Sequence, residues 1–558
     1  MDPKQVRLMY AVASAAAVGL VTIVCVRTAL LSSRPTPRAP PASLAPLARI
    51  ASLLGASRDA MAERLAAALR LRTISYETAE GNAASLLEKK DGEASQKSCG
   101  GCVCCVSPAT RTTTQDACTS PTLEALNESR SAFVAFHKHL QTSFPLIHTV
   151  LERHVVNRYS LVYVWRPVGV EFNARPAVAL AAHLDVVPVP DAADWIHPPF
   201  AGCIADGFIN GRGAIDDKHS VLTICEAVEA MLAVGTKPTR PILLAFGHDE
   251  EIGGFDGAAA IAKEVPRLLS ASCTGGGRPL SFLLDEGLFL LRGIVPGVSR
   301  RVALICTREK GHVNVELKVE AKAGHSSVPG QNSAIGRLAA AVTAVERAGS
   351  HAPLYDEPAF GLLRALAPDL PLLVRTVIAN AWLFAPLLRF SLLSGGNATA
   401  ALLRSTTAVT MTAGGIKSNV LPPVATALVN HRVHPAETVA DVVQRDRAAV
   451  GKGVSIRAFE ELEPAPVSRA TGAPGWEAVC DAIAAVFPDA AVAQGLMLAN
   501  TDTRHFWALA DDIYRHCPVS ITLTETAMFH GKDEKIAVDQ LPNLATFYAA
   551  VLLSSACG

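Results

Sequence analysis

From residue 175 onward, short apolar runs alternate with helical stretches and with loops that carry carboxylates. Three apolar runs are evident, at 177–182, 241–247 and 281–284. Helical periodicity occupies the two intervals between them, at 220–234 and 257–269. Continuous apolar strands joined by helices are typical of a mostly parallel sheet that is covered on both faces. We therefore predict an α/β domain with helices on either side of its sheet, and we expect ligands beyond the carboxyl ends of the strands.

Between residues 311 and 463 the pattern changes, because apolar and polar positions alternate as in strands with one solvated face. The predicted strands are 312–321, 408–413, 424–433 and 454–459, and the predicted helices are 332–347 and 436–450. This order is βαββαβ, that of a split ferredoxin-like unit. We predict a lid or dimerisation domain at 311–463, inserted between two parts of the catalytic domain at 126–310 and 464–558.

An apolar stretch at 370–393 interrupts the inserted unit. It contains Arg375, Pro386 and Arg389, which favour buried or interfacial helices over a membrane span, although a span stays open as the alternative.

The N-terminal segment, residues 1–30, contains 19 uncharged and mostly apolar residues between positions 8 and 26, with Lys4 and Arg7 before them. This length just reaches the ~20 residues that a bilayer requires. We predict a cytosolic tail and a signal-anchor helix, and hence a single-pass type II membrane protein with a lumenal catalytic domain in the secretory or vacuolar (lysosomal) pathway. A cleaved signal peptide with secretion, and a buried helix, are the alternatives.

Residues 31–125 form a predicted linker with a Pro-rich stalk at 34–46 and a polar insertion at 78–122. The insertion holds five cysteines, Cys99, Cys102, Cys104, Cys105 and Cys118. A zinc ribbon would need a second ligand pair nearby, so a surface loop, pinned by disulfides in an oxidising lumen, is the favoured interpretation. The sequons at Asn127 and Asn397 fit a lumenal glycoprotein.

Composition excludes several classes of protein. Half of the 558 residues are hydrophobic, which rules out a wholly disordered chain. The 51 basic and 51 acidic residues balance, so nothing indicates a nucleic-acid-binding protein. Thirteen cysteines are too few for a disulfide scaffold of this length.

Metal-ligand side chains recur near successive predicted strand ends. His183, Asp216, Glu251 and Asp285 are separated by 33, 35 and 34 residues, close to the length of a βαβ repeat, and His530 follows near the C-terminus. Two histidines and three carboxylates suit two divalent ions, with zinc favoured and cobalt or manganese possible. One carboxylate can bridge both ions.

Two further acids sit beside this set. Glu250 is adjacent to Glu251 and is available to accept a proton from water. Asp185 is two residues from His183, so both point to the same face of a strand and Asp185 can orient the imidazole.

A set of motifs spread over roughly residues 130 to 555 resembles the M20 dizinc metallopeptidases. The motifs are HLDVVP (183–188), DW and PPF (194–200), GRGAIDDKHS (211–220), GHDEEIGG (247–254), LDEG (284–287), GHSSVP (324–329), NATAALLRSTTAVTMTAGGIKSNVLP (397–422), NHRVHP (430–435), NTDTRHF (500–506) and FHGKDEKI (529–536). The full set is similar to the branch that contains yeast-type Gly-X carboxypeptidase and the mammalian N-acyl amino acid amidase/synthase.

The resemblance implies a role for each matching residue. Asp216 would bridge two zinc ions per subunit, His183 and Asp285 would complete one, and Glu251 and His530 the other. Glu250 would be the general base, with Asp185 supporting His183. His325 would polarise the scissile carbonyl in its own or a partner subunit's site. Asn419 and Arg432 would hold the substrate's carboxylate.

The resemblance implies hydrolysis of an amide next to a free amino-acid carboxylate, by an enzyme that forms a homodimer through residues 311–463. Carboxypeptidase action on short peptides is the leading prediction, and action on N-acyl amino acids is the alternative. A non-catalytic binding protein is disfavoured, because all five predicted ligands and the base are present.

Overall fold

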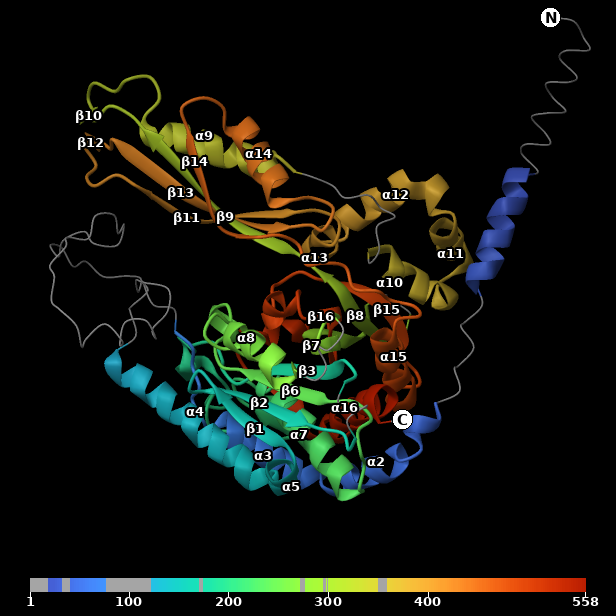
Figure 1. Cartoon of the computed structure of the whole chain (residues 1–558). Helices are drawn as coiled ribbons and strands as arrows, with labels where there is room; N and C mark the ends of the chain where they lie inside the picture. The colour runs from blue at the N-terminus through green and yellow to red at the C-terminus, as the bar shows by residue number, and fades with distance from the viewer. Residues whose placement is uncertain are drawn as a thin grey trace, which may run out of the picture.

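The computed structural model describes residues 19–32, 41–76, 122–169, 174–270, 276–294, 298, 300–349 and 359–557. They form a large α/β domain and a smaller domain that extends from it as an arm (Figure 1). The predicted cysteine-bearing insertion at 78–122 lies almost wholly outside these residues.

The large domain is built on an eight-stranded sheet. Across the sheet the strands are β1 (Glu152–Val156), β2 (Ser160–Trp165), β6 (Ile242–Gly247), β3 (Ala177–His183), β7 (Leu280–Arg292), β16 (Ala510–Thr522), β8 (Val302–Glu309) and β15 (Ala491–Met497). The central strands β6, β3, β7 and β16 are parallel, as is the pair β8 and β15.

The remaining pairs in this sheet are antiparallel. The sheet is therefore mixed, and the prediction of a mostly parallel sheet describes only its centre. The physical reason at one edge is the short turn between β1 and β2, which joins neighbouring strands as a hairpin.

Helices cover both faces of this sheet. They are α2 (Leu47–Ala56), α3 (Arg58–Leu69), α4 (Leu123–Ser143), α5 (Pro145–Val150), α7 (Lys218–Ala233), α8 (Ala258–Leu268), α15 (Pro474–Val486) and α16 (Leu541–Ala556). On β3, Val178 and Leu180 pack into a core shared with α7, α15 and α16, whereas Ala177 and Ala179 pack with α8 on the opposite face. Alternate burial on two faces explains why β3 is apolar throughout.

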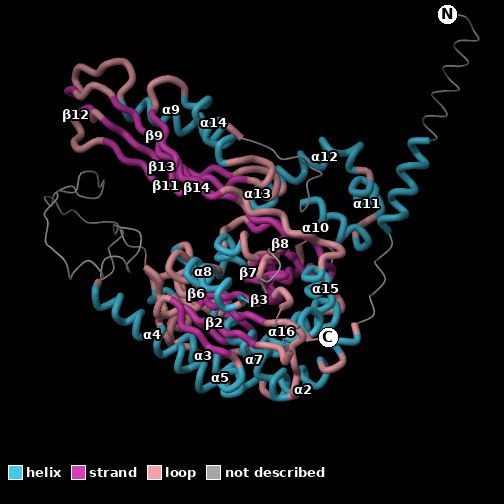
Figure 2. Tube along the Cα trace, viewed as in Figure 1, coloured by secondary structure: helices cyan, strands magenta, loops and turns pink. Residues whose placement is uncertain are grey.

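The arm is a four-stranded antiparallel sheet with two helices on one face (Figure 2). Its elements are β9 (Gly311–Glu320), β10 (Gly324–His325), α9 (Ala334–Arg347), β11 (Thr406–Gly414), β12 (Val420–Leu421), β13 (Val424–Val433), α14 (Val439–Val450) and β14 (Ser455–Leu462). The sheet order β11-β13-β9-β14 is that of the predicted βαββαβ unit. Val313, Val315 and Leu317 of β9 face the helices, which accounts for the alternation in the sequence.

Four short helices, α10 (Ala359–Leu366), α11 (Leu372–Ala379), α12 (Ala381–Ser394) and α13 (Asn397–Ala401), occupy the insertion between α9 and β11. Within the described residues no one helix has both the length and the apolar character of a membrane span, although α11 and α12 together do, with a bend of 111° between them. The predicted anchor at 8–26 begins outside those residues, and its described part belongs to the short helix Gly19–Ser32. The predicted N-terminal transmembrane helix therefore finds no support in the part of the chain described.

Candidate active site

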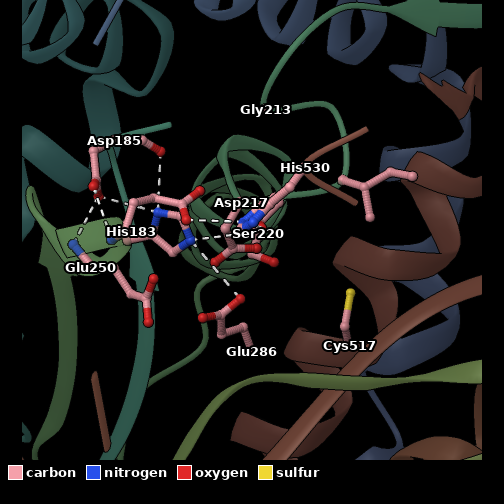
Figure 3. A network of polar contacts seen from close by, with 12 residues as sticks. His183, Asp185, Gly213, Asp217, Ser220, Glu250, Glu286, Cys517 and His530 are labelled. Carbon is pink, nitrogen blue, oxygen red and sulfur yellow. Dashed lines mark hydrogen bonds and ion pairs between the residues drawn. The ribbon is translucent and has the colours of Figure 1, made fainter. Parts of the chain in front are cut away.

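Four of the five predicted ligands come together at the carboxyl ends of the central strands, namely His183, Asp216, Glu251 and His530. Figure 3 shows the two histidines of this group. His183 is the last residue of β3, Glu251 follows β6, and Asp216 lies in the loop before α7. His530 arrives from the C-terminal part of the chain, between the short helix η8 (Glu525–Met528) and β17 (Lys535–Ala537).

Asp216 stands between the two histidines. Its Oδ1 lies 2.9 Å from His183 Nε2, and its Oδ2 lies 3.1 Å from His530 Nε2. Glu251 Oε2 lies 3.0 Å from the same nitrogen of His530. Each oxygen of one carboxylate thus faces a different imidazole, which is the donor arrangement that a residue bridging two cations requires.

Asp185 supports this arrangement from behind. Its Oδ1 lies 3.2 Å from His183 Nδ1, and its two oxygens accept hydrogen bonds from the backbone N–H groups of Glu250 and Glu251, each at 3.1 Å. The hydroxyl of Ser75 donates a further bond to Oδ2 at 2.6 Å. Asp185 therefore ties β3 to the loop after β6 and fixes the orientation of the His183 ring.

Glu534 holds the loop that carries Asp216. Its fully buried carboxylate accepts hydrogen bonds from the backbone N–H groups of Gly213, Ile215 and Asp216, and from Arg212 Nη1 at 2.6 Å. The Asp216–Asp217 peptide bond in this loop is cis. β17 also pairs with β5 (Phe208–Asn210), so the C-terminal segment and this loop are joined by both backbone and side-chain bonds.

The electrostatics of the cluster are those of crowded acids around two imidazoles. Burial opposes protonation of His183, yet its hydrogen bonds with Asp185 and Asp216 raise its pKa well above the ordinary value. Hydrogen bonds with Asp216 and Glu251 raise the pKa of His530 to about 10. Burial raises the pKa of Glu251 to about 7 and that of Asp285 to about 6. Buried carboxylates repel one another, so a bound cation would stabilise this cluster.

Several buried oxygens in this region have no hydrogen-bond partner, namely Glu251 Oε1, Asp217 Oδ2, Asp285 Oδ2 and Asp502 Oδ1. An orphaned carboxylate oxygen in a buried site is costly unless a cation or water meets it. Imidazole and carboxylate donors are the ligand set of zinc and related divalent ions. The residues present therefore fit divalent metal ions.

The structure groups Glu286, rather than its neighbour Asp285, with the metal-ligand atoms. Glu286 Oε2 lies 3.9 Å from His183 Nε2, and His183, Asp217 and Glu286 form a second possible metal group beside that of His183, Asp216 and Glu251. Asp285 is also buried on β7, where it pairs in register with Arg515. Neighbouring strand residues point to opposite faces, so one of the two acids faces the cluster more directly.

Glu250, the predicted base, lies at the start of the short helix η4 (Glu250–Ile252), with its side chain close to His183 (Figure 3). Burial, together with the charges of Asp502, Glu251 and Asp216, raises its pKa well above the ordinary value. A carboxylate beside the metal-ligand cluster is placed to accept a proton and to return it.

The predicted substrate residues fall into two separate places. His325 and Asn419 meet at the tip of the arm, where Ser326 N donates to Asn419 O at 3.0 Å and β10 pairs with β12. Arg432 lies at the opposite end of β13, where its Nη1 donates to Asn500 Oδ1 of the large domain at 2.5 Å. The ten residues of β13 span roughly 30 Å, so Asn419 and Arg432 of one chain are not brought together.

Sequence reasoning missed four residues of the site, Asp217, Glu286, Asn500 and Glu534. Asp217 and Glu286 are each adjacent to a predicted ligand, and Asn500 and Glu534 lie within the quoted motifs NTDTRHF and FHGKDEKI. Their place beside predicted ligands or inside the motifs marked them as candidate site residues. Their contacts join distant parts of the chain, however, and could be known only from the fold.

A family model described as peptidase family M20/M25/M40 matches residues 179–554. The chain is 39% identical over 424 residues to a carboxypeptidase S-like protein of Dictyostelium discoideum, covering 75% of this chain and 78% of that protein. It is 35% identical over 423 residues to human N-fatty-acyl-amino acid synthase/hydrolase PM20D1, covering 75% and 81%. It is 31% identical over 451 residues to carboxypeptidase S of Saccharomyces cerevisiae, covering 73% and 76%.

Among solved structures, the fold is similar to that of human carnosine dipeptidase 1. The TM-score is 0.60 at 14% identity, with 93% of this chain and 99% of that chain covered. At this identity the similarity concerns the fold alone, and the family is shown by the family model and the sequence relatives.

Proposed function

Because this chain belongs to peptidase family M20/M25/M40 and is a hydrolase, we propose that it uses zinc to hydrolyse an amide bond next to a free amino-acid carboxylate. The leading substrate is a short peptide that loses its C-terminal residue. The second candidate is an N-acyl amino acid, favoured by the 35% identity to human N-fatty-acyl-amino acid synthase/hydrolase.

The observation that carries the proposal is the position of Asp216, whose two oxygens each face a different histidine. His183, Asp216, Glu251 and His530 would hold two ions, together with either Asp285 or Glu286. When bound, the ions would polarise the scissile carbonyl and lower the pKa of a water molecule.

Glu250 supplies the proton transfer in this proposal. Its carboxylate accepts a proton as water oxygen bonds to the amide carbon, and it returns that proton to the amine nitrogen as the carbon–nitrogen bond breaks. The position of Glu250, directly before the predicted ligand Glu251 and beside His183, supports this role.

The substrate carboxylate would bind at the junction of the two domains. Arg432 lies there, and its pKa is lowered by burial and by the nearby charge of Arg504. Guanidinium groups bind carboxylates bidentately. His325 and Asn419 are too distant to join Arg432 in one chain. We therefore propose a homodimer in which the partner subunit's arm tip reaches this site.

We also propose a lumenal or secreted catalytic body, either anchored through residues 8–26 or released by cleavage there. Protease treatment of intact vesicles tests this, since a lumenal body is protected and a cytosolic one is digested.

Turnover by the purified full chain separates the candidates. We expect release of leucine from a blocked Gly-Leu dipeptide, loss of that activity with a chelator, and recovery on adding zinc. Faster cleavage of a long-chain N-acyl amino acid would assign the second candidate instead. Activity on neither substrate after zinc addition would contradict both.

A further inference from the structure

Three short helices present apolar side chains outward on one side of the molecule. They are Gly19–Ser32, α11 and α12, which lie together beside the large domain (Figure 1). Twelve exposed large hydrophobic residues belong to them, Leu20, Val21, Ile23, Val26, Leu30, Leu372, Leu373, Val374, Trp382, Leu383, Leu387 and Phe390. Leu373 is 82% exposed and Phe390 72%. An exposed apolar surface of this extent marks an interaction site.

Polar contacts hold the three helices as one unit. Arg27 Nε donates to Ala379 O at 3.0 Å, and Asn380 Nδ2 donates to Thr28 Oγ1 at 3.3 Å. Arg375 donates from Nη1 to Ser32 Oγ at 2.9 Å and from its other nitrogens to backbone carbonyls of the α10–α11 connection. The polar groups of these helices are thus turned inward onto one another, which leaves the apolar side chains to face outward.

The unit is also fixed to the large domain. Phe360 of α10 packs both against the main core and against the small core around Leu388 of α12. Arg300 Nη1 lies 3.4 Å from Asp369 Oδ2, at the end of the segment that leads into α11. A partner bound to these helices would therefore set the orientation of the whole enzyme.

The chemistry of this face points to a lipid bilayer as the partner. The only charged residues from 370 to 394 are Arg375, whose guanidinium is bonded inward, and Arg389, so this face carries almost no charge that would have to leave water. Trp382 is half-exposed, as suits an aromatic side chain at headgroup level.

We propose that α11 and α12 dock in the plane of a lipid bilayer, with their apolar side chains among the acyl chains and the helix Gly19–Ser32 packed against them. The bend of 111° between α11 and α12 favours lying at the interface over crossing it. This proposal does not depend on the substrate, and it concerns α11 and α12 in addition to the N-terminal segment.

Tryptophan fluorescence of the full chain on phosphatidylcholine–phosphatidylserine vesicles with brominated acyl chains tests the proposal. We expect brominated lipid to quench part of the emission and Trp382→Phe to abolish that part. Trp507→Phe, on the large domain, is the matched control and should leave the quenching unchanged. Leu373→Glu with Phe390→Glu should also remove the quenching of Trp382, whereas Val134→Glu with Val168→Glu, at other exposed apolar positions, should not.

Three results would overturn the proposal. The chain could fail to bind the vesicles, or it could bind through its N-terminus while Trp382 remains unquenched. In the third, Trp382 would show no quenching, and Leu373→Glu with Phe390→Glu would convert a dimer into a monomer in sedimentation, which would assign the face to a second copy of the chain.

Discussion

The buried carboxylate of Glu534 accepts a hydrogen bond from the backbone N–H of Asp216 at 3.1 Å. It joins the C-terminal segment, which carries His530, to the loop whose Asp216 faces both histidines. The same carboxylate pairs with Arg212, which is itself buried. Glu534, which is not itself a predicted metal ligand, therefore fixes the positions of two predicted ligands, Asp216 and His530.

Replacing Glu534 with Gln should destabilise the protein and loosen the metal site together. Removing one partner of a buried ion pair leaves Arg212 uncompensated, which costs about 3–5 kcal/mol. We expect a lower denaturation midpoint and a lower metal content after dialysis, measured by urea unfolding and elemental analysis. Glu264→Gln, at an exposed ion pair, should change the free energy of unfolding by less than about 1 kcal/mol. An unchanged midpoint for Glu534→Gln would contradict the role given to this residue.

Much of this site could be predicted because strand ends in an α/β sheet converge. His183, Asp216 and Glu251 follow strands at regular intervals, and they lie within contact distance of one another. The direction of individual side chains could not be predicted in the same way. Asp285 and Glu286 are adjacent in an apolar strand, and the sequence does not say which one faces the cluster.

The substrate residues show a second limit. Asn419 and Arg432 were paired by resemblance, yet a ten-residue strand separates them and places them at opposite ends of the arm. Contacts such as that of Arg432 with Asn500 depend on how the arm meets the large domain. The local periodicity of the sequence does not determine how the arm is oriented relative to the large domain.

Substitutions at the two neighbouring acids will decide which completes the metal site. We expect Glu286→Gln to lower the metal content further than Asp285→Asn, because Glu286 Oε2 lies 3.9 Å from His183 Nε2. Atomic absorption on dialysed protein gives the metal-to-protein ratio for each variant. A larger loss in Asp285→Asn would support Asp285 as the ligand, as the family resemblance implies.

Glu250→Gln should separate catalysis from metal binding. Glutamine has the same shape but cannot accept the proton, so we expect kcat to fall by about 10²–10⁴-fold. The metal content should stay near that of the unmodified enzyme, because Glu250 is not among the grouped ligand atoms. Turnover and elemental analysis on one preparation test both points, and retention of kcat would show that another group moves the proton.

Lys310, at the junction of β8 and β9, should make stability rise with pH. Burial, with the nearby charges of Arg404 and Arg432, lowers its pKa to about 7, and Glu437 opposes that shift. The unfolded chain therefore binds more protons than the folded one between about pH 7 and the ordinary lysine value of 10.5. Burying the charged lysine lowers the free energy of unfolding by its full amount below pH 7, and this destabilisation decreases as the pH rises.

Lys310→Met removes this group and should flatten that part of the pH dependence. Urea unfolding at pH 7 and pH 9 is the measurement, and the stability difference between variant and wild type should shrink at the higher pH. Lys318→Met, at an exposed position on β9, is the control and should show no such change. A difference that stays constant with pH would mean that Lys310 is charged in the folded protein.

Arg432 should act on substrate affinity through the substrate's carboxylate. Its hydrogen bond to Asn500 places it where the arm meets the large domain, and Arg504 adds a second positive charge there. A charge-assisted bond contributes about 1.5–3 kcal/mol, so Arg432→Ala should raise KM roughly 10- to 100-fold, with a smaller effect on kcat. Arg432→Lys keeps the charge but loses the planar fork, and its KM should lie between those of the wild type and Arg432→Ala.

The decisive comparison uses a substrate whose carboxylate is replaced by a carboxamide. Wild type and Arg432→Ala should have similar KM values for this substrate, because the interaction that the mutation removes is already absent. If Arg432→Ala were equally impaired on both substrates, Arg432 would be holding the domains together through Asn500 rather than binding the carboxylate.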